Sequence, residues 1–203
     1  MKQKIIFATG NKGKMKEVSR ILEDLGLAVI SMRDAGISME IEENGSSYEE
    51  NALLKARAVA GCAKGNCIVL ADDSGLEIDY LNREPGIYSA RYLGEDTSYR
   101  EKNNNLIERL AGVPDEKRTA RFVCAIAAVL PDGRELTTLG VIEGRIGYEE
   151  KGSGGFGYDP IFFVPEYGKT TAELTEEEKN AVSHRGRALE AMKIELRKNM
   201  MVD

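Results

Sequence analysis

The chain has 203 residues, 42% of them hydrophobic and 31% charged, which suits one large domain or two closely packed lobes with a soluble surface. Its apolar stretches are shorter than a membrane-spanning helix, and its N-terminal segment turns polar too early for a secretory signal, so we expect no membrane partner. The net charge of −6 argues against broad nucleic-acid binding, and three cysteines without metal-ligand spacing fit free thiols in a cytoplasmic protein.

The first predicted elements are a strand, a glycine turn and a helix. A short apolar run, Ile5 to Phe7, precedes the turn A-T-G-N-K-G-K at 8–14, and apolar residues then recur at helical spacing until Gly26. The N–H groups and partial positive charge of a helix N-terminus suit phosphate, and three lysines add full charge. The glycine spacing is not that of a Walker A loop. The alternative is an ordinary turn with solvated lysines.

An acidic segment follows, with five glutamates and no basic residue in residues 40–50. A capping box starting at Ser46 or Ser47 predicts a helix that buries residues such as Ala52 and Ala56. Glu43 lies before this cap, so capping does not explain it. A fold that brings the basic turn and this acidic segment together would form a metal–polyphosphate site. Lys55, on the predicted helix, faces the phosphates in that interpretation and solvent in the simpler one.

The next apolar run starts at Cys67 and ends in Asp72, Asp73, Ser74 and a glycine. Ligands of open α/β sheets bind beyond the carboxyl ends of the strands. Because neighbouring strand residues point to opposite faces, the two carboxylates cannot enter one pocket if the strand continues through them. One of them would then hold a metal or activate water, and the other would brace the loop. The alternative is a polar turn that ends a buried strand.

The later elements are a helix over 97–110, a β-hairpin over 118–146 around a P-D-G turn, and two final helices. A capping box of Thr175 and Glu178 starts the first of these helices. Leu189, Met192 and Leu196 would face the core from the second. The alternation of strands and helices predicts a mixed-sheet α/β or α+β fold, elongated and with two lobes.

The segment G-G-F-G-Y-D-P at 154–160 combines glycines, the rings of Phe156 and Tyr158, and the carboxylate of Asp159. Glycines allow close approach to a ligand, rings offer flat faces, and a carboxylate accepts hydrogen bonds from a base edge. This composition predicts a slot for a heterocyclic base; the simpler interpretation is a glycine loop closed by a hydrophobic strand. His184, the single histidine, and Arg185 supply further donors, although a lone histidine is more often structural.

Taken together, these motifs resemble the inosine triphosphate pyrophosphatase family, whose members hydrolyse non-standard purine nucleotides. The resemblance covers nearly the whole chain and depends on the order of its motifs. These are T-G-N-K-G-K, E-E-N-G followed by E-N-A-L-L-K-A, A-D-D-S-G-L, P-G-I-Y-S-A-R-Y, G-G-F-G-Y-D-P-I-F-F and S-H-R-G. One departure is Asn44, where related bacterial proteins often have threonine.

The resemblance implies one domain over residues 1–203, built as an elongated mixed sheet with flanking helices and two lobes around a central substrate cleft. It also implies a cytoplasmic homodimer that requires Mg²⁺ and hydrolyses a nucleoside triphosphate between its α and β phosphorus atoms. Residues implied to contact the phosphates are Thr9, Gly10, Asn11, Lys12, Gly13, Lys14, Lys55 and Lys179. Glu43 and Asp73 would organise the metal, with Asp73 also accepting the proton of water; Ser74 would touch substrate. Base recognition would involve Phe156, Gly157, Tyr158, Asp159, His184 and Arg185.

Three other functions fit parts of this pattern. A non-catalytic nucleotide sensor would use the same slot but has no need of carboxylates at Glu43 and Asp73. A nucleic-acid-binding module would stack bases on Phe156 and Tyr158, against the acidic balance of the chain. A pyrophosphatase for modified pyrimidine nucleotides would share the fold. The sequence leaves open the preference among inosine, deoxyinosine and xanthosine triphosphates.

Overall fold

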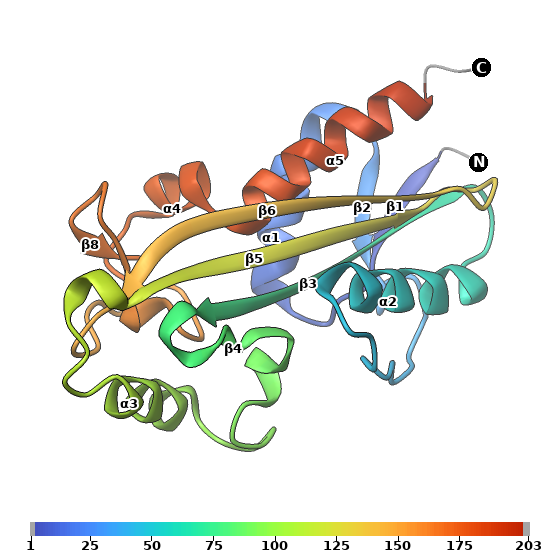
Figure 1. Ribbon diagram of the computed structural model, residues 1–203. Helices are drawn as coiled ribbons and strands as arrows, with labels where there is room; N and C mark the ends of the chain where they lie inside the picture. The colour runs from blue at the N-terminus through green and yellow to red at the C-terminus, as the bar shows by residue number, and fades with distance from the viewer. Residues whose placement is uncertain (1–2, 201–203) are drawn as a thin grey trace. The chain divides into compact units, whose positions relative to one another are not determined.

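The computed structural model describes residues 3–200, except for the side chains of residues 12, 180 and 200 (Figure 1). Its strands are β1 (Lys4–Phe7), β2 (Ala28–Ser31), β3 (Cys67–Ile78), β4 (Glu84–Pro85), β5 (Thr119–Val129), β6 (Glu135–Ile146), β7 (Phe162–Val164) and β8 (Lys169–Thr170). Its α-helices are α1 (Lys12–Leu22), α2 (Tyr48–Cys62), α3 (Tyr99–Arg109), α4 (Glu176–Val182) and α5 (His184–Met200). The predicted mixed α/β class is confirmed.

The strands form one mixed sheet in the order β2-β1-β3-β5-β6-β7-β8, with β4 paired to β3. Strand β1 lies parallel to both β2 and β3, whereas β7 is antiparallel to β6 and β8. The register pairs Phe7, the last residue of β1, with Leu70 of β3, two residues before Asp72. The glycine turn that follows β1 and the D-D-S-G segment of β3 are therefore neighbours.

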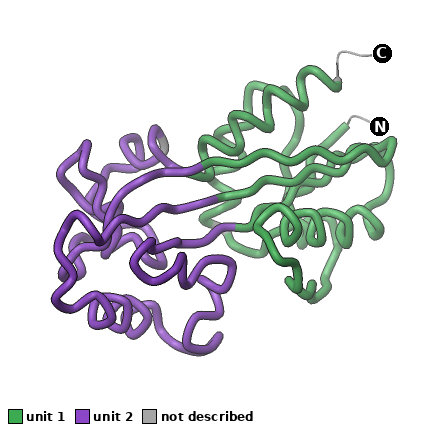
Figure 2. Tube along the Cα trace, viewed as in Figure 1, with its two compact units in different colours: residues 1–73, 124–140, 184–203 green, residues 74–123, 141–183 purple. Residues whose placement is uncertain are grey.

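The chain divides into two compact units (Figure 2). The first comprises residues 1–73, 124–140 and 184–203, and the second comprises residues 74–123 and 141–183. Strands β3, β5 and β6 each contribute residues to both units. Each unit has its own hydrophobic core.

The core of the first unit follows from strand alternation. Ile5 and Phe7 of β1 and Ile68 and Leu70 of β3 point to the same face, where they pack with helices α1 and α5. The helices contribute Val18 and Leu22 from α1 and Leu189, Met192 and Leu196 from α5, all fully buried. Burying such a side chain contributes about 1.5–3 kcal/mol, so this core fixes both helices on the sheet. The three residues predicted to face the core from the last helix do so.

Helix α2 begins at Tyr48, and the side chain of Ser47 caps it by accepting a hydrogen bond from the N–H of Glu50 at 3.1 Å. The Glu50 carboxylate accepts instead from the N–H of Ser46 at 2.7 Å, one residue before the expected partner. The predicted helix start is confirmed. Ala52 and Ala56, which were predicted to be buried, are fully buried.

Two further predicted helices lie in the second unit. Helix α3 starts after Ser98, and α4 starts with the predicted capping box of Thr175 and Glu178. The predicted hairpin is β5–β6, whose strands contribute to both units; its P-D-G turn, with Gly133 at φ +86°, belongs to the first unit. The core of the second unit joins residues from the end of β3, from α3 and from β6 and β7. In the described part of the chain, no helix is long and apolar enough to cross a membrane.

Candidate active site

The predicted site residues fall into two groups, one in each unit. The first unit holds Thr9, Gly10, Asn11, Lys12, Gly13, Lys14, Glu43, Lys55, Asp73, His184 and Arg185. The second unit holds Ser74, Phe156, Gly157, Tyr158, Asp159 and Lys179. The division does not follow the predicted roles throughout: Lys179, implied to contact the phosphates, lies in the second unit, whereas His184 and Arg185, implied to contact the base, lie in the first.

The basic turn is organised by Asn11, the N-cap of α1. Its Oδ1 accepts hydrogen bonds from the N–H groups of Gly13 at 2.8 Å and Lys14 at 3.1 Å, while its own N–H donates to Thr9 Oγ1 at 3.1 Å. Gly10 is exposed, and among the described residues no atom lies within 4 Å of a Cβ built on it. A ligand can therefore approach this backbone closely. The side chain of Lys12 lies outside the described part of the structure.

Strand β3 continues through the D-D-S-G segment to Ile78, so the alternative of a turn after Ala71 is wrong. Alternation then separates the two carboxylates, as expected for a continuous strand. Asp72 shares the face of Ile68 and Leu70 and meets side chains of α1 and α5. Asp73 points the other way and meets side chains of α2. The half-buried Ser74 follows on the same strand.

Asp73 forms a buried cluster with two residues of α2. Its Oδ2 accepts a hydrogen bond from Asn51 Nδ2 at 3.1 Å, and its Oδ1 lies 3.4 Å from Lys55 Nζ. The same ammonium lies 3.2 Å from Glu43 Oε1, so two carboxylates share one lysine. Burial raises the pKa of Asp73 to about 6, and the charge of Glu43 adds to this rise while Lys55 opposes it. A carboxylate with such a pKa is suited to accept a proton near neutral pH.

Asp72 has a different environment. Its carboxylate accepts hydrogen bonds from Lys14 Nζ at 2.9 Å and Arg185 Nε at 3.1 Å, and Arg185 NH1 donates to Glu17 at 2.9 Å. Burial alone would raise the pKa of Asp72, but the charges of Lys14, Arg185 and Lys55 outweigh it and hold this pKa far below its ordinary value. Asp72 is therefore ionised and ion-paired with Lys14 and Arg185, whereas the pKa of Asp73 is raised.

The S-H-R-G motif forms the start of α5. His184 is half-buried, and Arg185 is buried to 3% exposure. The helix lies close to β6, because a Cβ at Gly140 would come within 2.1 Å of the His184 carbonyl oxygen. Arg185 was predicted to donate to the base; the structure shows two of its nitrogens donating to carboxylates inside the first unit.

The pair of Glu43 and Asp73 fits a magnesium ion. Mg²⁺ prefers oxygen ligands, and in nucleotide sites it is held by one or two carboxylates together with substrate phosphates. Among the described residues, no group of three or more His, Cys, Asp or Glu side chains is arranged to hold a metal. The two carboxylates lie 3.2 and 3.4 Å from the same ammonium, so their oxygens converge on one place. This donor set suits an ion that substrate phosphates help to bind.

In the second unit, Asp159 organises the glycine loop. Its Oδ2 accepts hydrogen bonds from Lys179 Nζ at 2.6 Å and from the N–H of Phe156 at 2.7 Å, and its Oδ1 accepts from Thr171 Oγ1 at 2.8 Å. A Cβ at Gly155, where φ is +73°, would lie 2.2 Å from Asp159 Oδ2. Gly155 therefore makes room for the side chain of Asp159. The sequence analysis had instead interpreted the glycines of this loop as allowing a ligand to approach closely.

The two aromatic rings of the loop differ in exposure. Phe156 is 52% exposed, and its ring centroid lies 5.3 Å from Lys179 Nζ. Tyr158 is only 4% exposed; its hydroxyl donates to the carbonyl oxygen of Ser89 at 2.6 Å, and its ring packs edge-on against Tyr99. The expectation that both rings are exposed stacking faces is wrong for Tyr158, because its ring belongs to the core. Phe156 is the exposed ring of the pair.

Sequence reasoning gave no role to several residues that the structure places in these clusters. Asn51 binds Asp73 and also accepts from the N–H of Gly45 at 2.8 Å. Its spacing of four residues from Lys55 puts both on one helix face, a signal that was available in the sequence. Ser89, in the P-G-I-Y-S-A-R-Y motif, supports Tyr158, and nothing local in that motif indicates this contact.

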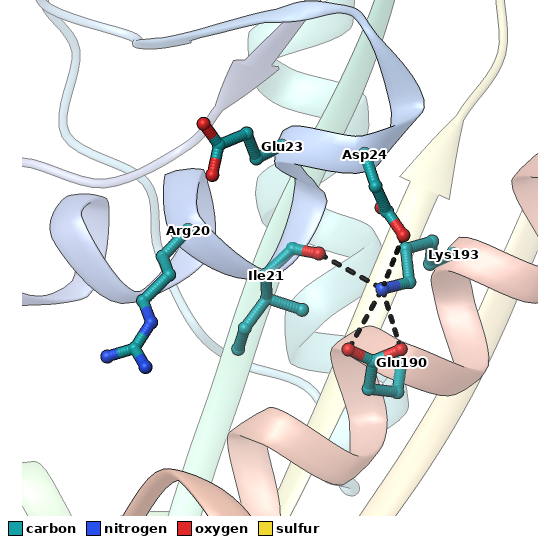
Figure 3. A pocket seen from close by; sticks show the side chains of 6 residues that line it. All are labelled: Arg20, Ile21, Glu23, Asp24, Glu190 and Lys193. Atoms are coloured by element: carbon teal, nitrogen blue, oxygen red, sulfur yellow. Dashed lines mark hydrogen bonds and ion pairs between the residues drawn. The ribbon is translucent and has the colours of Figure 1, made fainter. Parts of the chain in front are cut away.

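A shallow surface cavity of about 430 Å³ lies elsewhere in the first unit (Figure 3). It is lined by Arg20, Ile21, Glu23, Asp24, Glu190 and Lys193. Lys193 Nζ lies 2.8 Å from a Glu190 oxygen, 3.3 Å from an Asp24 oxygen and 3.2 Å from the Ile21 carbonyl oxygen. The lining carries three carboxylates and two cations, and none of the predicted site residues is among it.

Comparison with known proteins places this fold and these motifs in a family. The model of the Ham1 family matches residues 5–195, and the chain belongs to that family. A protein of Clostridium perfringens named dITP/XTP pyrophosphatase is 49% identical over 96% of this chain and 98% of its own length. A Bacillus subtilis protein of the same name is 49% identical over 95% of this chain and 96% of its length. The structure of the Staphylococcus aureus Ham1 protein matches with a TM-score of 0.87 and 40% identity, covering 98% of this chain and 100% of that one.

Proposed function

We propose that this protein is a Mg²⁺-dependent nucleoside triphosphate pyrophosphatase that converts inosine, deoxyinosine and xanthosine triphosphates into the nucleoside monophosphate and pyrophosphate. Removal of these nucleotides from the nucleotide pool would be its role. Family membership and the names of the relatives support the class of reaction. The geometry of the two residue groups supports the roles that follow.

The observation that carries the proposal is the cluster around Asp73. This carboxylate is almost buried, is fixed by Asn51 and Lys55, and has a pKa raised to about 6. A carboxylate that only braced a loop would be expected to resemble Asp72, with its pKa held low by cations. The contrast supports Asp73 as the proton acceptor and Asp72 as a structural anion, because the environments of the two residues shift their pKa values in opposite directions.

In the proposed reaction, Asp73 accepts a proton from a water molecule while the water oxygen forms a bond to the α phosphorus. The bond between that phosphorus and the bridging oxygen breaks, and pyrophosphate leaves with the bridging oxygen and the bonding electron pair. Lys14 and Lys55 neutralise charge on the phosphate oxygens, which otherwise repel the nucleophile. Magnesium bound at Glu43 and Asp73 would supply further charge neutralisation and orient the phosphates.

For the base, Phe156 provides the stacking face, since base–aromatic stacking contributes about 1–3 kcal/mol per base. Lys179 lies above the same ring. Purines with an oxygen at the six position would satisfy nearby donors, whereas the amino group of adenine would leave those donors unpaired at a cost of about 1–3 kcal/mol. The resemblance assigns such donors to His184 and Arg185 as well. This reasoning predicts strong activity on inosine triphosphate and weak activity on adenosine triphosphate.

The test is a nucleotide panel incubated with the protein and Mg²⁺, with the phosphorus products identified by ³¹P NMR. Inosine monophosphate and pyrophosphate are expected as the first products. Orthophosphate with a nucleoside diphosphate would contradict the proposal. Binding without turnover would favour a nucleotide sensor, and turnover of modified pyrimidine nucleotides alone would favour the related pyrophosphatase.

We further propose that the chain works as a single domain over residues 1–203, as a homodimer and in the cytoplasm, all on the family resemblance. Light scattering should then give twice the mass of one chain in solution. A monomer at the concentrations used for assay would contradict the dimer. Salt-sensitive binding to RNA or DNA would revive the nucleic-acid-binding alternative, which has lost Tyr158 as an exposed ring.

A further inference from the structure

Asp72 is a buried carboxylate to which the proposed reaction gives no role. Its side chain is 2% exposed, and it accepts hydrogen bonds from two residues that the resemblance assigns to substrate binding, Lys14 and Arg185. Both oxygens lie near Lys14 Nζ, at 3.1 and 2.9 Å. The carboxylate therefore acts on the substrate-binding side chains themselves, and it does so from inside the core of the first unit.

These contacts tie helix α1 to the sheet and to α5 at two points. Lys14, in the first turn of α1, reaches Asp72 on β3, and Glu17, three residues later, reaches Arg185 on α5. Arg185 in turn donates to Asp72, which completes a chain of alternating charges from Lys14 to Glu17. Arg185 and Asp72 are both nearly inaccessible, whereas Lys14 keeps 22% of its side chain exposed. Lys14 is thus the member of the chain that a dissolved anion can reach.

A polyphosphate that binds Lys14 must share it with this carboxylate. A like charge that lies one ionic contact behind the lysine opposes the anion, because the Coulomb energy between unit charges is appreciable at separations of several ångströms. The position of Lys14 does not depend on Asp72 alone, since Asn11 Oδ1 holds the Lys14 backbone N–H at 3.1 Å. Loss of the carboxylate would therefore free the ammonium charge without removing it from the turn.

We propose that Asp72, by competing for Lys14, weakens the binding of pyrophosphate so that this product can leave. The inference rests on the proposed function, because it concerns the product of that reaction. It gives the two aspartates of the D-D-S-G segment complementary tasks. Asp73 takes part in the chemistry, while Asp72 limits how tightly the basic turn holds polyphosphate.

The test compares pyrophosphate binding to the wild-type protein and to Asp72→Asn by calorimetry, in one buffer with excess Mg²⁺. In the variant, an amide replaces a carboxylate of the same shape, and its NH₂ group cannot accept from Lys14. We expect pyrophosphate to bind about tenfold more tightly, which corresponds to ~1.4 kcal/mol. The KM for inosine triphosphate should fall in parallel. Purely structural damage would weaken pyrophosphate binding. Tighter binding would therefore indicate that Asp72 competes for Lys14 and does not serve the fold alone.

Glu135→Gln provides the matched control, because Glu135 is also an ion-paired carboxylate of the first unit, 2.7 Å from Arg57. This variant should bind pyrophosphate as the wild type does. Unchanged or weaker binding by Asp72→Asn would overturn the inference. If wild-type protein neither binds pyrophosphate nor hydrolyses inosine triphosphate, the proposed function itself is wrong; if it does both, only the role of Asp72 is at stake.

Asp72→Asn leaves Arg185 buried with less negative charge around it and can therefore fail to fold. Glu17→Gln then decides the question, because Glu17 is at the other end of the charge chain and keeps 17% of its side chain exposed. With Glu17 neutral, Arg185 interacts more strongly with Asp72, and Asp72 holds Lys14 less. Pyrophosphate should bind about two- to threefold more tightly to this variant. Equal or weaker binding would overturn the inference.

Discussion

A glycine should be required at position 155 for stability and substrate binding, because the ion pair of Asp159 and Lys179 occupies the space that a Cβ would need. Gly155→Ala would place a Cβ 2.2 Å from Asp159 Oδ2 and 2.6 Å from Lys179 Nζ, at a φ of +73°. Both contacted atoms are the ends of side chains, so the backbone can survive while the Asp159 carboxylate gives up its hydrogen bonds to Lys179 and to the N–H of Phe156. The exposed ring of Phe156 would then lose the backbone contact that orients it.

The expected loss in the free energy of unfolding of Gly155→Ala has two parts. A non-glycine residue with this left-handed backbone costs about 1–2 kcal/mol. A hydrogen bond to a charged group contributes about 1.5–3 kcal/mol, and displacement of Asp159 weakens at least one. We expect Gly155→Ala to lower the free energy of unfolding by about 3–5 kcal/mol in urea denaturation. Its KM for inosine triphosphate should rise.

Gly112 supplies the matched control. Its φ is +75°, it lies in the same unit, and among the described residues no atom lies within 4 Å of a Cβ built on it. Gly112→Ala should therefore lose only the backbone part, about 1–2 kcal/mol, and keep its KM. Equal losses of stability in the two variants, with KM unchanged in both, would refute the argument that the Asp159–Lys179 pair requires a glycine.

Three further predictions concern the proposed chemistry. Asp73→Asn should lower turnover at least about 10²-fold, since it removes the proton acceptor. A circular dichroism spectrum like that of the wild type would show that the variant folds. Near-normal activity at saturating Mg²⁺ would exclude Asp73 as the proton acceptor. Glu43→Gln should raise the Mg²⁺ concentration that gives half-maximal activity, and an unchanged requirement would count against Glu43 as a metal ligand. Phe156→Ala should raise KM for inosine triphosphate by about tenfold or more through lost stacking, while Tyr80→Ala, at the same 52% exposure, should leave KM unchanged.

The class of fold and the family could both be inferred from the sequence. Apolar periodicity predicted the first strand and α1, and capping boxes predicted the starts of α2 and α4, because these signals act between residues a few positions apart. Each motif is also a short run of neighbouring residues, so the whole set could be recognised in the sequence. The family match confirms the resemblance that the motifs indicated. The sequence also showed that a continuous strand would separate Asp72 from Asp73.

Whether that strand continues depends on contacts distant in the chain: β3 pairs with β1 before the aspartates and with β4 after them, and most of its residues are buried. Long-range contacts then gave adjacent, chemically identical carboxylates opposite properties: burial beside Glu43 for Asp73, and cations from two helices for Asp72. The same reason explains the loop rings. Phe156 is exposed, whereas Tyr158 packs in the core of the second unit and donates its hydroxyl to the carbonyl oxygen of Ser89, far away in the chain; no local pattern encodes such a partner.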